Sequence, residues 1–179
     1  DEAGSDLARA LTSAGWEQCR LTHNTWLPLV QARGPIHQLV LSSSAQRCEE
    51  TAKGILGREI EWRGVEGIYD GSLQPQGSEL FERFSYNSLR VYHDGGGKDF
   101  LDAWAASVVE AMQEEVADLG PSDATLFVFG HSIYNNALAL RLAELMGLGE
   151  AHRDLILDTS LQETDGFLLD SAGANGAGE

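Results

Sequence analysis

Residues 124–136, A-T-L-F-V-F-G-H-S-I-Y-N-N, decide the fold of this chain. The apolar run at 124–129 predicts a buried strand that stops at Gly130-His131, and residues 134–146 predict a helix just beyond it. A strand that delivers a polar residue to the start of a helix is typical of open α/β sheets, which bind ligands at the carboxyl edge of their strands. His131 would there contact a phosphate beside helix-terminal N–H groups, or it would simply cap the turn.

The first half of the chain shows the same alternation of helix and strand. Thr12 is expected to cap a helix that Pro28 kinks or interrupts and that Gly34-Pro35 ends. The run I-H-Q-L-V-L at 36–41 predicts a strand, and Ser44 is expected to cap a helix that stops at Gly57. Residues 58–64 predict a short strand or an extended segment.

The second half is expected to add two helices before the 124–129 strand and two strands after it. One helix is predicted at Ser78–Phe84, and Asp99 is expected to cap another through Leu119. Between them, H-D-G-G-G at 93–97 predicts a flexible loop. The predicted closing strands are 155–159 and 166–169, and residues 171–179 predict a disordered tail. The fold class is therefore α/β, a three-layer sandwich around a mostly parallel sheet, as one domain over residues 1–170.

Composition excludes several classes of function. The net charge is −16, with 28 acidic against 12 basic residues, which argues against binding to nucleic acid. No stretch approaches the roughly 18 apolar residues of a membrane span, so a soluble, not membrane-spanning protein is predicted. The chain starts at Asp1 without a visible targeting segment. The compartment stays open, an organelle after N-terminal processing included. Cys19 and Cys48 are expected to be small buried thiols, and no metal or cofactor is predicted.

A second basic residue follows a predicted strand end. In S-S-S-A-Q-R-C-E-E-T-A, residues 42–52, Arg47 falls in the first turn of the next helix. Its guanidinium could reach over the sheet edge and fork onto phosphate oxygens. The alternative is a surface ion pair with Glu49 or Glu50.

Three motifs in this order resemble the histidine phosphatase superfamily, which includes the cofactor-dependent phosphoglycerate mutases. An L-T-x-x-G-x-x-Q element is matched by residues 11–18, and an S-x-x-x-R-x-x-x-T-A element by residues 43–52. Gly130-His131 matches the second-histidine motif, and the resemblance covers about residues 6–170. It implies the three-layer α/β fold named above.

The resemblance also implies a phosphoryl site. In that family, the histidine of an R-H-G motif attacks phosphorus, and residues corresponding to Arg47 and His131 neutralise the transferred group. Ser132 would contribute to binding phosphate here. The proton donor would be Glu66, with Asp70 as the second candidate, unless Glu66 is an ordinary solvated acid. In one branch of the family the acid directly follows the second histidine, and Ser132 stands at that position instead.

The chain departs from the family in having no R-H-G motif. None of the other histidines ends an opening strand: they are His23, His37, His93 and His152. In the family, the R-H-G strand lies in the middle of the sheet, so we expect the strands at 36–41 and 124–129 to lack a neighbour. An upstream segment, a docked fragment or a partner chain would supply it. An upstream segment would be an apolar strand of about five residues ending in R-H-G or a degraded form of it.

Three hypotheses for function follow. The first is a non-catalytic domain that binds phosphate or a small phosphorylated metabolite and serves as a binding or assembly subunit with other protein chains. The second is an active phosphomonoesterase or phosphomutase whose R-H-G segment lies outside this sequence. The third is an α/β serine hydrolase using Ser132, but Tyr134 replaces the last glycine of its G-x-S-x-G motif and no Asp lies between Ser132 and His152. A dinucleotide site is disfavoured because no G-x-G-x-x-G follows a strand.

Overall fold

The computed structural model describes residues 6–31, 37–57, 62–65, 67–69, 74–117 and 124–169. They belong to two compact units. The first unit is formed by residues 1–70 and 111–130, and the second by residues 71–110 and 131–179. The single domain predicted over residues 1–170 stays a prediction.

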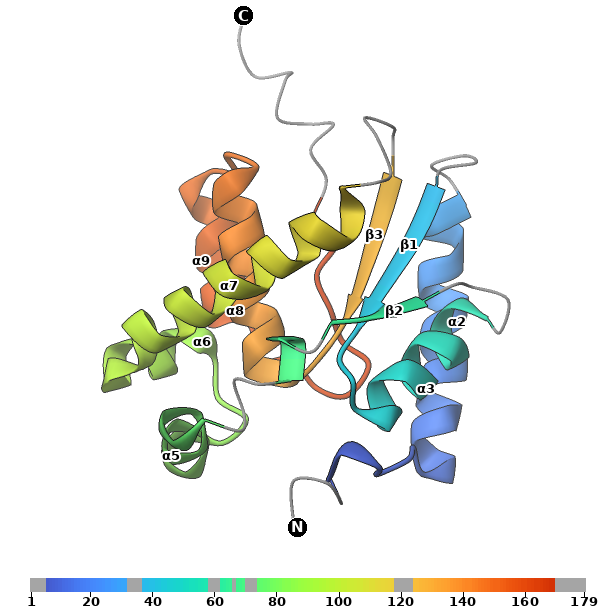
Figure 1. The fold of residues 1–179 in the computed structure, drawn as a ribbon, viewed down its shortest axis with the longest axis horizontal. Helices are drawn as coiled ribbons and strands as arrows, with labels where there is room; N and C mark the ends of the chain where they lie inside the picture. Colours follow the sequence, from blue (N-terminus) through green and yellow to red (C-terminus); the bar gives the residue numbers. More distant parts are fainter. Residues whose placement is uncertain are drawn as a thin grey trace, which may run out of the picture. The chain divides into compact units, whose positions relative to one another are not determined.

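The first unit contains a parallel sheet of three strands, which confirms an α/β architecture. The strand order is β2-β1-β3, with β1 at His37–Ser42, β2 at Trp62–Gly64 and β3 at Ala124–Phe129 (Figure 1). Both pairs are parallel. Leu39, Val40 and Leu41 of β1 are all buried, as expected for a central parallel strand covered on both faces.

The neighbours of β1 correct one expectation. β1 pairs directly with β3 over six residues, from His37 opposite Ala124 to Ser42 opposite Phe129, and it pairs with β2 on its other edge. The expected loss of a neighbour at 36–41 is therefore wrong. Among the described residues β3 has β1 as its one partner strand, and Leu126 on β3 is 37% exposed. The direct pairing leaves no place for a further strand between β1 and β3, and a missing neighbour of the 124–129 strand stays a prediction.

Two helices accompany this sheet. α2 spans Ser13–Gln31, and Gly15 donates its N–H to the Thr12 hydroxyl at 3.1 Å, which confirms Thr12 as the cap. The helix continues through Pro28, so the predicted interruption is wrong, and the alternative of a kink stays a prediction. Pro28 lies in the last turn of α2, where its missing N–H removes one i→i−4 hydrogen bond and little helix follows it.

α3 spans Gln46–Leu56 and packs against both α2 and β1 (Figure 1). Its N-cap is Ala45, so the predicted cap at Ser44 is wrong. Ser43 instead accepts the Ala45 N–H through its hydroxyl at 3.2 Å. Gly57 ends the helix as predicted, at a positive φ of 102° that favours glycine.

The second unit is helical. Its elements are α5 (Pro75–Phe84), α6 (Leu89–Tyr92), a π-helical turn η1 (His93–Gly97), α7 (Lys98–Val116, which runs on into the first unit), α8 (Ser132–Leu145) and α9 (Glu150–Asp158). The predicted helix at 78–84 is confirmed and starts three residues earlier.

Several predictions for this unit are wrong. The glycines at 95–97 do not form an open loop, because residues 93–97 join α6 directly to α7 through a kink at Gly96, whose φ is 91°. α7 begins at Lys98, so Asp99 lies inside its first turn and is not its cap. Residues 155–158 belong to α9, and residues 166–169 form no strand. A short apolar run such as Leu155-Ile156-Leu157 does not by itself distinguish a strand from a helix.

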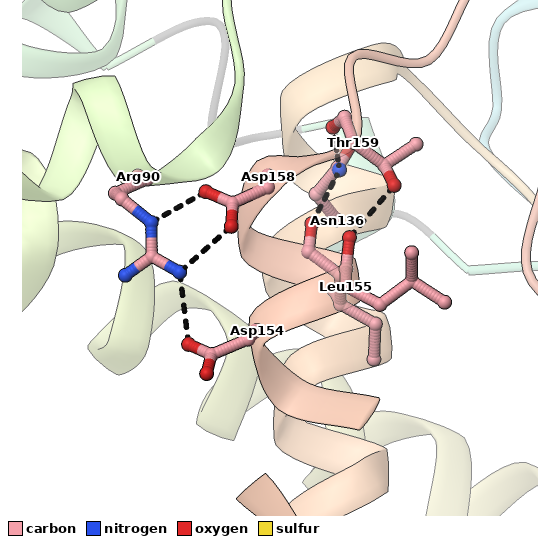
Figure 2. A network of polar contacts seen from close by, with 7 residues as sticks. Arg90, Asn136, Asp154, Leu155, Asp158 and Thr159 are labelled. Atoms are coloured by element: carbon pink, nitrogen blue, oxygen red, sulfur yellow. Dashed lines mark hydrogen bonds and ion pairs between the residues drawn. The ribbon is translucent and has the colours of Figure 1, made fainter. Parts of the chain in front are cut away.

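Buried polar groups hold α9 in place (Figure 2). The Asn136 amide on α8 donates to the main-chain oxygens of Ile156 at 3.2 Å and Thr159 at 2.8 Å. On the solvent side, Arg90 of α6 contacts the carboxylates of Asp158 and Asp154. The predicted disordered tail, residues 171–179, lies outside the described residues.

Candidate functional site

The carboxyl ends of β1 and β3 meet at one edge of the sheet. Ser42 stands opposite Phe129, and Ser43 donates its N–H to the Phe129 carbonyl at 2.8 Å. Both serines are fully buried. Gly130, the residue directly before His131, lies at this same edge, because its carbonyl is 3.5 Å from the Cys48 sulfur on α3.

Arg47 is placed at this edge by the first turn of α3. Its Nη2 donates to the Asp6 carboxylate at 2.9 Å, and its Nη1 donates to the Asp6 main-chain oxygen at 2.7 Å. Its side chain is 19% exposed. In these contacts Arg47 thus pairs with Asp6 and not, as the alternative held, with Glu49 or Glu50. Glu49 pairs with Lys53, and Glu50 accepts the Leu11 N–H at 2.6 Å.

Tyr69 completes this cluster, and sequence reasoning missed it. Its hydroxyl donates to the same Asp6 oxygen at 2.7 Å, although the two residues are 63 positions apart. Burial works to raise the pKa of Asp6, but the Tyr69 hydrogen bond and the Arg47 charge outweigh it and leave that pKa below its ordinary value. Burial first, and then Asp6, raises the pKa of Tyr69, so the phenol keeps its proton at neutral pH. Nothing in the sequence around Tyr69, G-V-E-G-I-Y-D, indicates that this tyrosine lies near Arg47.

The cluster has an apolar floor. Ala45, Cys48 and Tyr69 form a buried group, against which Leu7 and Phe129 pack. Burial raises the pKa of the Cys48 thiol, which makes it a poor nucleophile at neutral pH. Cys19 is also buried and free, so the prediction of two small buried thiols is confirmed.

His131 belongs to the second unit, where it is the N-cap residue of α8 with an extended backbone. Asn135 donates its N–H to the His131 carbonyl at 2.8 Å, which starts the helix. Because Arg47 lies in the first unit, the convergence of Arg47 and His131 on one anion stays a prediction.

Ser132, the first residue of α8, uses its hydroxyl to donate to the Leu161 carbonyl at 3.2 Å. A serine nucleophile needs a base to take its proton, and a main-chain carbonyl is not one. No hydrogen bond of Ser132 to an imidazole occurs among the described residues, so the serine-hydrolase hypothesis gains no support.

Glu66 and Asp70, the two candidate proton donors, lie outside the described residues. The remaining histidines have other settings where the structure describes them. His23 on α2 bonds through Nδ1 to the Ile55 carbonyl at 2.6 Å, which ties α2 to α3. His93 lies in η1 and His152 in α9.

Comparisons of the chain with protein-family models, with curated proteins and with solved structures found no match. The resemblance to the histidine phosphatases therefore depends on the three sequence motifs. Within the described ranges, no three His, Cys, Asp or Glu side chains are grouped so as to hold a metal ion. No helix in the same ranges has the length and apolar character needed to cross a membrane.

Proposed function

We propose that this chain is a histidine-phosphatase-like domain of the three-layer type, which binds phosphate or a small phosphorylated metabolite through Arg47. It acts as a binding or assembly subunit with other protein chains and has no phosphatase activity by itself. One observation carries the proposal: at the carboxyl edge of the parallel sheet, the Arg47 guanidinium and the Tyr69 hydroxyl hold an oxyanion, the carboxylate of Asp6.

The chemistry of this pair suits phosphate as well as carboxylate. A guanidinium presents several N–H donors in a planar fork, and it stays charged at every physiological pH. Both Arg47 and Tyr69 are largely shielded from solvent, which strengthens a charge-assisted hydrogen bond. The location agrees with the rule that open α/β sheets bind ligands at the carboxyl ends of their strands.

His131 and Ser132 remain proposed phosphate ligands on the strength of the sequence motif. His131 directly follows the strand end whose Gly130 lies at the Arg47 edge. Transfer of a phosphoryl group would also need a nucleophile, and the sequence contains no R-H-G motif. The active alternative requires an R-H-G segment outside these 179 residues, with Glu66 as its proton donor.

A binding measurement tests the proposal. The 179-residue chain is titrated with inorganic phosphate and with phenyl phosphate at fixed ionic strength, and calorimetry and ³¹P NMR measure the binding. Both ligands should give saturable binding. Arg47→Ala should weaken it at least about tenfold, the loss expected for a charge-assisted contact. Arg20→Ala is the matched control, because Arg20 is an exposed arginine of the same unit that pairs with Glu17 at 2.6 Å. Equal binding by the wild type and Arg47→Ala would contradict the proposal.

A further inference from the structure

The N-terminal segment of the chain supplies its own ligand to Arg47. Asp6 is 41 residues away from Arg47 in the sequence, yet it offers both a carboxylate oxygen and its main-chain oxygen to the two terminal nitrogens of the guanidinium. The carboxylate also accepts the Tyr69 hydroxyl. Asp6 therefore occupies the donors that an external oxyanion would use.

A second, apolar contact holds the same segment. Leu7, the next residue, packs against the buried group of Ala45, Cys48 and Tyr69. The charged contact and the apolar contact are adjacent in the chain and adjacent in the fold. Release of one would loosen the other, because the two residues share one short backbone segment.

We propose that Asp6-Leu7 is an autoinhibitory latch on the Arg47 anion site. Phosphate binds at Arg47 and Tyr69 only when Asp6 leaves, and Tyr69 then donates its hydroxyl to the phosphate. This inference rests on the proposed function and adds a regulatory element and a further ligand residue to it. The departure of Leu7 would uncover the apolar floor beside the anion, so a phosphomonoester with an apolar group should bind better than inorganic phosphate.

The latch acts by competition within the molecule. The measured dissociation constant is the intrinsic constant divided by the fraction of chains with the latch open. Asp6→Asn removes the negative charge but keeps the size of the side chain and the main-chain oxygen. It should increase the affinity for phenyl phosphate on the order of tenfold. Leu7→Ala weakens the apolar half of the latch and should increase that affinity by a smaller factor.

The test uses calorimetric titration of the full chain with phenyl phosphate and with inorganic phosphate. The variants are Asp6→Asn, Leu7→Ala, and Asp6→Asn combined with Arg47→Ala. Asp99→Asn is the matched control, because it removes the same charge from the exposed first turn of α7. Circular dichroism checks the fold of each variant, and Leu7→Ala carries the test alone if Asp6→Asn does not fold.

Tighter binding by Asp6→Asn or Leu7→Ala, lost when Arg47→Ala is added to Asp6→Asn and absent in Asp99→Asn, is the expected result. Arg47-dependent binding that is equally strong in the wild type and both latch variants would overturn the latch and leave the proposed function standing. Absence of binding in every variant would overturn both. Tighter binding that persists without Arg47 would show that the ligand sits elsewhere, which also overturns the latch.

Discussion

At the scale of single residues, the neutral side-chain amide of Asn136 should contribute more to the stability of the fold than the ion pairs of Arg90. The Asn136 side chain is fully buried and donates to two main-chain oxygens at the end of α9. The Arg90 guanidinium makes three contacts with Asp154 and Asp158, but its side chain is 40% exposed and those of the two aspartates are more so (Figure 2). Water competes for exposed charges, whereas a buried carbonyl that loses its donor has no substitute.

We expect Asn136→Ala to lower the free energy of unfolding by about 1–3 kcal/mol, the usual cost of unsatisfied buried polar groups. Arg90→Ala should cost less, and its effect should shrink further in high salt. Urea denaturation followed by circular dichroism measures both. Asn135→Ala is the control on the same helix, because Asn135 is less buried and makes no side-chain hydrogen bond in the described part of the chain. A larger loss for Arg90→Ala than for Asn136→Ala would refute this ranking.

At the scale of elements, α2 and α3 can pack closely because the α3 residue at their contact, Gly54, is a glycine and has no side chain. A Cβ added at Gly54 would lie 2.7 Å from the Cys19 Cβ, which is fixed close to the α2 backbone. Alanine normally stabilises a helix by about 1 kcal/mol relative to glycine. Here the overlap opposes that gain, because the two helices would have to move apart.

Gly54→Ala should therefore destabilise the chain by about 1 kcal/mol or more, within the range found for overpacked cores. Gly64→Ala is the control in the same unit, because the nearest atom to its added Cβ is 3.5 Å away on the Trp62 ring. That change should be neutral or slightly stabilising. Thermal unfolding compares the two, and a stabilised Gly54→Ala variant would show that α2 and α3 are less tightly packed than described.

The kinked turn η1 carries a titratable side chain that is mostly buried, the imidazole of His93. The His93 side chain is 10% exposed, its Nε2 has no hydrogen bond among the described residues, and Asp102 is 4.0 Å away. Burial lowers the pKa of His93, although Asp102 opposes this shift. Because the unfolded state binds the proton more readily than the folded state, this contribution to stability is present above the ordinary histidine pKa and is lost as the pH falls through and below it.

Lowering the pH from about 8 to about 5.5 should thus reduce the melting temperature more in the wild type than in His93→Gln, which does not titrate in this range. Differential scanning calorimetry at several pH values gives the comparison. His152→Gln is the control for a histidine on the exposed face of α9. Identical pH dependence in the wild type and His93→Gln would mean that His93 is accessible to water in the folded state.

At the scale of the whole molecule, the proposed function predicts no phosphatase activity for these 179 residues, because their sequence contains no R-H-G motif. In the proposed function Arg47 and His131 would neutralise the charge of a phosphoryl group, but neither stands in an R-H-G motif to attack phosphorus. The 179-residue chain should therefore hydrolyse an aryl phosphate at no more than the background rate. A release assay with p-nitrophenyl phosphate measures this, with His131→Ala as the comparison. Robust turnover that His131→Ala abolishes would show that His131 has a different role from the one proposed.

Strong local signals in the sequence predicted several elements correctly. The apolar runs at 36–41 and 124–129 are β1 and β3 to within one residue, and Thr12 and Gly57 cap helices as their chemistry suggests. The carboxyl edge where Arg47 lies also followed from its position after a strand. These features depend on residues that are close in the chain, so their patterns can be recognised without a structure.

Long-range packing decided the rest. The pairing of β1 with β3 and the packing of the helix at 150–158 on α6 and α8 depend on contacts between distant segments. The grouping of Asp6, Arg47 and Tyr69 is the clearest case, because no local pattern links residues 41 and 63 positions apart. The sequence alone determined which strand end carries the arginine. Only the tertiary structure decided that an acid and a phenol meet it there, because burial and charge pairing act through space and not along the chain.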